Sequence, residues 1–224
     1  MTGYQMIKNG ISMGIIVFIV AVILFAIRFL LHKKKKDQIL LLISLCLLLL
    51  CFPVYFAVSV RQYSGSDPTK QKQFTVTSQD LHDGVWDPVI SNTEKGENLS
   101  PQLSWDPVKG AKGYVVYMID PDGYDWIHMK TDSLTDTSLS RGEVPPFTRK
   151  DPDGPGYIGP YPPSGTHTYE VYVFALRNLK DGYAGKVNQV SNGIDQISSL
   201  VDVNENGDTG NIIAFGKLSG TYTR

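Results

Sequence analysis

Two carboxylates, Asp120 and Asp122, stand on either side of Pro121, directly after the apolar segment 114–119. A rigid proline between two carboxylates at the exit of a strand allows both to point into one cleft. Asp and Pro are also ordinary turn formers, so this pattern taken alone favours a plain turn. The chemistry of the pair therefore depends on what the rest of the chain brings beside it.

Two histidines are the natural partners of these carboxylates. His128 follows Trp126 and Ile127, where the chain should re-enter a sheet, although a lone histidine at a strand start is more often structural. His167 and Tyr169 point to one face of a strand, because they are two residues apart. The loop before them is unusually rigid, with five punctuating residues: Gly159, Pro160, Pro162, Pro163 and Gly165. Such a loop suits ligand binding, because little ordering entropy is lost, but it suits a scaffold equally well.

Other chemistries have weaker support. Segment 202–208 begins like a calcium loop, but Ile213 occupies the twelfth position, where a bidentate carboxylate is required, so we interpret it as a solvated turn. Residues 61–224 contain three histidines and no cysteine, a composition that argues against a closed structural zinc site. No nucleophile elbow, zinc-protease helix or phosphate-binding loop motif is present. We therefore expect no metal and no cofactor.

The elements that position these residues are strands. Short runs rich in β-branched and aromatic residues are bounded by turn residues, and one segment alternates in polarity as a half-buried strand should. The expected strands are 74–77, 114–119, 169–176 and a terminal pair, 212–215 and 218–222, while the best helical candidate is 194–201. Abundant proline and glycine leave little room for further helix. We predict a mainly β domain, an antiparallel β-sandwich with long functional loops.

The first 60 residues are physically different from the rest. Two apolar runs, 11–31 and 39–60, each have about the 20 residues that a helix needs to cross a bilayer. The loop between them, 32–38, is too short for anything but a tight connection. We therefore predict a transmembrane hairpin over residues 1–60, a linker over 61–73 and a globular domain over 74–224. A cleaved secretory signal is the less favoured alternative.

Charge gives the orientation of this hairpin. The loop carries four consecutive lysines, so the positive-inside rule places it in the cytoplasm, with the N-terminus and the C-terminal domain extracytoplasmic. Residues 61–224 carry 15 basic and 21 acidic side chains, a net charge of −6. That balance excludes a strongly basic nucleic-acid binder. Both cysteines lie in the second apolar run, so the exported domain has no disulfide. A cysteine-poor exported domain suggests a bacterial source.

The motifs in their order resemble the phosphatidylethanolamine-binding protein (PEBP) family, specifically its bacterial Raf-kinase-inhibitor-like branch. The resemblance covers about residues 74–224 and rests on four pieces: Asn98-Leu99-Ser100-Pro101 with Leu103-Ser104-Trp105, Asp120-Pro121-Asp122 with His128, the segment from Gly159 to Tyr169, and the ending from Gly216 to Tyr222. Four departures from the family pattern stand near the site: Gly123, Tyr124, Met129 and Thr168. Thr168 replaces a frequent arginine, which changes the charge at the edge of the pocket.

The resemblance implies a small pocket at one end of the sandwich that accepts phosphate-like anions. Carried over residue by residue, its lining would be Asp120, Asp122, His128, His167 and Tyr169, with Pro162 and Pro163 shaping a wall. Imidazole and phenol groups can donate to phosphate oxygens. A carboxylate could orient a histidine through its other ring nitrogen, or receive the ammonium of an ethanolamine head group.

These features favour a non-catalytic binding module, held at the outer face of a cell membrane by a two-pass anchor. Its ligand would be a phosphate-like anion or a phospholipid head group. One alternative is a regulator or inhibitor of an envelope protein partner. Another is a hydrolase in which a His/Asp pair activates water.

Overall fold

The computed structural model describes residues 72–224 and scattered helical positions between residues 20 and 46. Among the residues described, no helix is long and apolar enough to span a bilayer. Most of the predicted hairpin, 11–31 with 39–60, and all of the linker up to residue 71 lie outside the described residues. The hairpin therefore stays a prediction.

The chain divides into two compact units, residues 1–64 with 205–207 and residues 65–204 with 208–224. The second unit contains both hydrophobic clusters of the described residues, from Phe74 to Tyr222. A unit with its own apolar core can fold independently of the rest of the chain.

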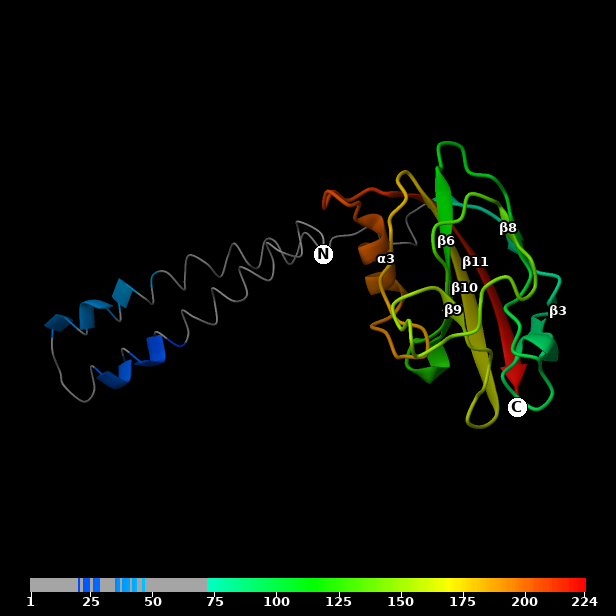
Figure 1. The fold of residues 1–224 in the computed structure, drawn as a ribbon, viewed down its shortest axis with the longest axis horizontal. Coiled ribbons are helices and arrows are strands. Elements are labelled where there is room, and N and C mark those ends of the chain that lie inside the picture. Colours follow the sequence, from blue (N-terminus) through cyan, green and yellow to red (C-terminus); the bar gives the residue numbers. More distant parts are fainter. Residues whose placement is uncertain are drawn as a thin grey trace. The chain divides into compact units, whose positions relative to one another are not determined.

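A large twisted sheet forms the centre of this domain (Figure 1). Its strand order is β3-β4-β11-β10-β6-β7-β9, and β1 also pairs with β11. The three central strands are the longest, and β6 is buried along its whole length. The bounds are β1 (Lys72–Gln73), β3 (Leu81–His82), β4 (Val85–Trp86), β6 (Gly113–Asp120), β7 (Trp126–Lys130), β9 (Gly156–Tyr157), β10 (Thr166–Leu176) and β11 (Ile212–Thr223).

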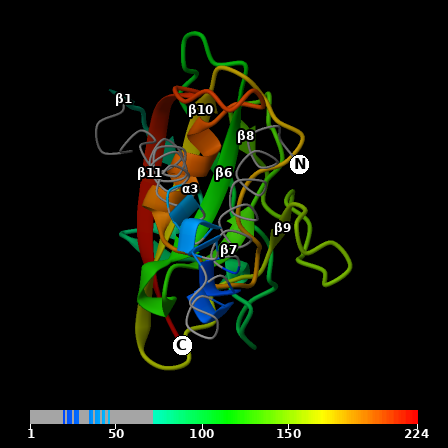
Figure 2. The same cartoon turned by 90° about the vertical axis from the view of Figure 1, so that its left-hand side faces the viewer.

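Each face of the large sheet is covered by a different layer. On one face lies a small sheet of order β2-β5-β8, formed by β2 (Val76–Thr77), β5 (Leu103–Trp105) and β8 (Ser138–Leu139). On the other face lies α3 (Ile194–Asp202), seen in front of the sheet in Figure 2, whose Ile197 and Val201 pack on Phe174 and its neighbours. Two short 3₁₀ helices, η2 (Pro88–Ile90) and η3 (Pro121–Gly123), lie in the connections. The mainly β, two-sheet architecture is therefore as predicted.

The fold corrects three sequence predictions. The expected terminal pair 212–215 and 218–222 is one continuous strand, β11, which pairs with β10 along its length. Segment 74–77 is not one strand, because β1 and β2 flank Phe74 and belong to different sheets. The sandwich is not wholly antiparallel, because β1 and β4 both pair with β11 in parallel. The strands at 114–119 and 169–176 and the helix at 194–201 are confirmed.

Candidate functional site

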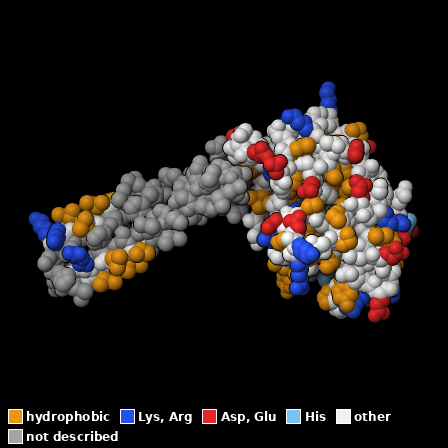
Figure 3. Space-filling model, viewed as in Figure 1, with side chains coloured by type: hydrophobic (Ala, Val, Ile, Leu, Met, Phe, Trp, Pro, Cys, Tyr) orange, Lys and Arg blue, Asp and Glu red, His pale blue; other side chains and the backbone are white. Residues whose placement is uncertain are grey.

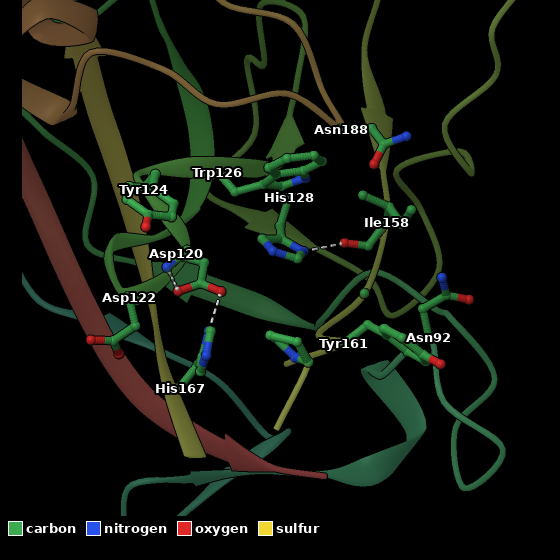
Figure 4. Close-up of a pocket in the computed structure, with 13 residues that line it drawn as sticks. Asn92, Asp120, Asp122, Tyr124, Trp126, His128, Ile158, Tyr161, His167 and Asn188 are labelled. Atoms are coloured by element: carbon green, nitrogen blue, oxygen red, sulfur yellow. Dashed lines mark hydrogen bonds and ion pairs between the residues drawn. The ribbon is translucent and has the colours of Figure 1, made fainter. Parts of the chain in front are cut away.

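A pocket of about 460 Å³ lies where β6 ends and β10 begins, with β7 beside them (Figure 4). The polar groups in its wall come from segments distant in the sequence and converge on one space. Its lining residues are Asn92, Asp120, Asp122, Gly123, Tyr124, Trp126, His128, Ile158, Gly159, Tyr161, Pro163, His167 and Asn188.

Asp120 is the last residue of β6 and caps the turn η3. Its Oδ1 accepts a hydrogen bond from the backbone N–H of Gly123 at 2.8 Å. A Cβ at position 123 would lie 2.8 Å from Oδ2, so a larger residue there would displace the Asp120 carboxylate. This local constraint accounts for Gly123, and it fixes the buried carboxylate at the pocket wall.

His167 is the partner of this carboxylate. Its Nδ1 lies 2.7 Å from Asp120 Oδ2, which leaves the Nε2 atom of His167 available to a ligand (Figure 4). Asp122 reinforces the same junction, because its Oδ2 accepts a hydrogen bond from the backbone N–H of Thr168 at 2.7 Å. The two carboxylates predicted from the sequence thus hold η3 against the start of β10, in addition to lining the pocket.

His128 lies in a bulge between β6 and β7. Met118 pairs with Met129 and Ile119 with Ile127, so His128 is the extra residue, and bulges commonly re-aim a side chain at a site. Its Nδ1 lies 2.7 Å from the carbonyl oxygen of Ile158, and a carbonyl only accepts, so Nδ1 carries a proton.

Burial determines the charge of His128. Desolvation lowers its pKa, although the Ile158 carbonyl and the negative charge of Asp120 act in the opposite direction. The neutral form is therefore favoured, and its Nε2 presents a lone pair. At neutral pH this histidine is a hydrogen-bond acceptor for a ligand, and it becomes a donor only when protonated.

Tyr169 lies behind the two histidines. Its ring meets that of His128 edge-on at 5.0 Å between centroids and stacks near that of His167 at 6.5 Å. Burial, with Asp120 nearby, raises the pKa of this phenol, so it stays neutral. The Asp120 carboxylate and the Tyr161 backbone lie within reach of its hydroxyl, so Tyr169 supports Asp120 from behind the pocket wall.

The segment 158–160 forms the opposite wall and is held by loops near the N-terminus of the domain. The backbone N–H of Gly159 donates to Asn98 Oδ1 at 2.7 Å, and Asn92 donates its N–H to the Pro160 carbonyl at 3.0 Å. A Cβ on Gly159 would collide with the carbonyl oxygen of Ile90. The Asn98 motif therefore serves the site indirectly, by fixing the carbonyl that holds His128.

The structure brings together most of the residues predicted from the sequence. Five of the seven line the pocket, namely Asp120, Asp122, His128, Pro163 and His167. Pro162 is buried and is not among the lining residues, and Tyr169 lies one layer behind the wall. Sequence reasoning missed Asn92 and Asn188, whose loops carry no motif that indicates a site, and Tyr161, which lies within the rigid loop but was not itself singled out.

Metal chemistry has no visible support in this part of the chain. Within the described residues, no group of three or more His, Cys, Asp or Glu side chains could hold a metal ion. The calcium-like segment has a structural use instead: the Asp202 carboxylate accepts hydrogen bonds from the backbone N–H groups of Gly210 at 2.8 Å and Ile212 at 2.7 Å.

Comparisons of sequence and structure relate this domain to known proteins. Residues 77–223 match the family model of the phosphatidylethanolamine-binding proteins. A UPF0098 protein of Methanothermobacter thermautotrophicus is 34% identical over 142 residues, which cover 58% of this chain and 85% of the relative. The UPF0098 protein YbhB of Escherichia coli is 40% identical over 97 residues, 36% of this chain and 61% of YbhB. The crystal structure of E. coli YbcL, a member of the mammalian PEBP family, shares 25% identity at a TM-score of 0.48, over 67% of this chain and 98% of YbcL.

Proposed function

The chain belongs to the phosphatidylethanolamine-binding protein family, and on that premise we propose that its pocket binds a phosphate-like anion or a phospholipid head group without catalysing a reaction. The observation that carries the proposal is the convergence of His128 and His167 on one pocket, with Asp120 orienting His167. A pocket mostly apolar in its wall, with a few fixed polar groups, is the usual form of a small-molecule site.

The hydrogen-bonding pattern narrows the class of ligand. Neutral His128 offers a lone pair, so it favours a ligand that brings a proton of its own, such as a monoprotonated phosphate monoester. Asp120 and Asp122 add negative charge at the wall, which a ligand ammonium group would balance. A phosphate that carries an amine group nearby satisfies both requirements.

We also propose that the domain is tethered to the outer face of a membrane by the hairpin predicted over residues 1–60. A tether raises the effective concentration of ligands in the same bilayer. A reporter that is active only in the cytoplasm, fused after Arg224, should then be silent. Activity of that reporter would contradict this orientation and would place the domain in the cytoplasm, where it could bind cytoplasmic partners.

Calorimetric titration of the domain, residues 65–224, tests the binding function. Inorganic phosphate and phosphoethanolamine should both bind saturably, and glycerol, which lacks the anion, should not. Heat signals no larger for phosphate than for glycerol would contradict the proposal.

A hydrolase is the second candidate, because the Asp120–His167 pair has the geometry of a general base held by a carboxylate. Such a base would activate water at Nε2 of His167. Release of phosphate from a chromogenic phosphate monoester, or of alcohol from a simple ester, would support this candidate. A rate unaltered by His167→Ala would exclude the pair from any such reaction.

A further inference from the structure

Exposed apolar side chains gather at the mouth of the pocket. Across the visible face of the domain, charged residues of both signs are interspersed (Figure 3). Within residues 72–224, four large apolar side chains are exposed: Val85 at 52%, Tyr124 at 84%, Tyr161 at 48% and Val190 at 58%. Tyr124 and Tyr161 belong to the pocket lining. Val85, on β4, is separated from β7 by β11, β10 and β6.

Val190 lies at the same mouth. It forms an antiparallel bridge with Trp126, flanked by hydrogen bonds from Ile127 to Gln189 and from Ser191 to Asp125. In such a narrow pair the two side chains lie close together on one face. Trp126 lines the pocket, so Val190 projects beside it. We call Tyr124, Tyr161 and Val190 the apolar rim.

Cations adjoin the apolar rim on one side. The Arg224 guanidinium lies 4.1 Å from the centre of the Tyr161 ring. Both residues, with Lys95 and Glu94, line a second cavity of about 210 Å³ that shares Tyr161 with the pocket. Tyrosine and long cationic side chains are the residues that suit the head-group level of a bilayer, because each has an apolar body and a polar end.

We propose that the apolar rim docks on the surface of a phospholipid bilayer, so that the pocket receives its head group while the lipid remains in the membrane. This inference rests on the proposed binding function and adds the surface on which it operates. The domain carries a net negative charge, so burial of the rim, rather than general attraction to anionic lipid, supplies the contact.

The length of chain before the domain favours a bilayer as the occupant. The apolar runs 11–31 and 39–60 precede the domain, and 11 residues, 61–71, separate them from β1. Fully extended, these residues reach roughly 35–40 Å. A domain of this size is roughly 40 Å across. The linker therefore allows the pocket mouth to turn toward the membrane that holds the chain.

Native tryptophan fluorescence offers a direct test in the full-length chain. The chain has three tryptophans, of which Trp86 and Trp105 are buried in the core and Trp126 lies at the mouth. The chain is incorporated into phosphatidylcholine vesicles whose acyl chains are brominated close to the carbonyl end. We expect the bromines to quench the Trp126 fraction of the emission, and Trp126→Phe to remove that quenching.

Lys109 supplies the control, since it is exposed in the turn before the start of β6, whereas the end of β6 lines the pocket. In the Trp126→Phe background, Lys109→Trp should be unquenched, whereas quenching of Lys109→Trp equal to that of Trp126 would overturn the docked orientation. Wild-type emission without quenching would overturn the inference as well, and would leave the rim as a surface for a protein partner. A phosphate titration of the same preparation reports separately on the pocket, so failure of the binding function is distinguishable from failure of docking.

Discussion

The carboxylate of Asp120 and the imidazole of His167 are 47 residues apart in the sequence and lie 2.7 Å apart in the structure. This contact joins the end of β6 to the start of β10, where two central strands of the large sheet open into the pocket. The other oxygen of Asp120 is held by the backbone of Gly123. The pair is therefore fixed from both sides before a ligand arrives, which lowers the ordering entropy of binding.

Replacing His167 by alanine should weaken phosphate binding at least about tenfold, because a hydrogen bond to a charged group contributes about 1.5–3 kcal/mol. Calorimetric titration of the variant measures this loss. His82→Ala is the control, since His82 is exposed on β3 and is absent from the pocket lining. Equal affinities of the His167 and His82 variants would remove His167 from the site.

Acid should weaken the folded state through His128. Burial lowers its folded-state pKa below the unfolded value of 6.5, so at intermediate pH the unfolded chain binds a proton that the folded chain refuses. The free energy of unfolding is therefore not reduced by His128 above about pH 6.5, and it declines as the pH falls below that value. Urea unfolding over this range should show a smaller decline in His128→Asn than in wild type. The same pH slope in both proteins would contradict the assignment of a neutral, buried His128.

A side chain at position 159 should disturb the pocket wall. Gly159→Ala places a Cβ against the Ile90 carbonyl, and overpacking of a rigid backbone contact costs about 3 kcal/mol. Gly182→Ala is the matched control, because a Cβ there meets nothing within 4 Å. Urea midpoints of the two variants measure the difference. A Gly159 variant as stable as the Gly182 variant would show that the backbone at Ile90 moves to accommodate the added Cβ at little cost.

Lys130 should be among the most sensitive positions of β7. Its buried ammonium donates to the carbonyl oxygens of Asp153, Tyr183 and Gly185, at 2.7, 3.2 and 2.8 Å. Desolvation lowers its pKa, with the nearby acidic groups opposing this effect. Lys130→Met leaves those carbonyls unpaired and should cost about 3 kcal/mol of unfolding free energy.

Lys186→Met provides the comparison for Lys130. Lys186 forms an exposed ion pair with Asp153 at 3.1 Å, and such pairs contribute about 1 kcal/mol or less. Chemical denaturation of both variants should therefore separate them clearly. Similar losses of unfolding free energy in the two variants would mean that the Lys130 ammonium does not make its three hydrogen bonds to the carbonyl oxygens.

The central strands could be predicted because their composition reflects burial on both faces. The runs 114–119 and 169–176 are apolar on both sides, and the structure covers them with the small sheet and with α3. The split of β11 was an error because Gly216 resembles a turn residue. In the structure this glycine makes room for Phe74 and Val76, a packing requirement that only the tertiary contacts reveal.

The candidate site could be predicted through the family resemblance, which carried over Asp120, His128 and His167, whereas residue type and spacing alone favoured a turn at Asp120 and a structural role for His128. Asn188 could not be predicted, because its loop takes its position from backbone hydrogen bonds to Ile127 that no local motif announces. The bulge that aims His128 at the pocket was equally hidden, since it depends on the register between β6 and β7.

An NMR titration of the domain with phosphate and then phosphoethanolamine, following the histidine ring signals, shows whether the pocket binds an anion. The exposed His82 serves as an internal reference. We expect saturable shifts of the His128 and His167 signals while those of His82 stay in place. Equal small drifts of all three histidines, without saturation at millimolar ligand, would contradict an anion-binding pocket in this domain.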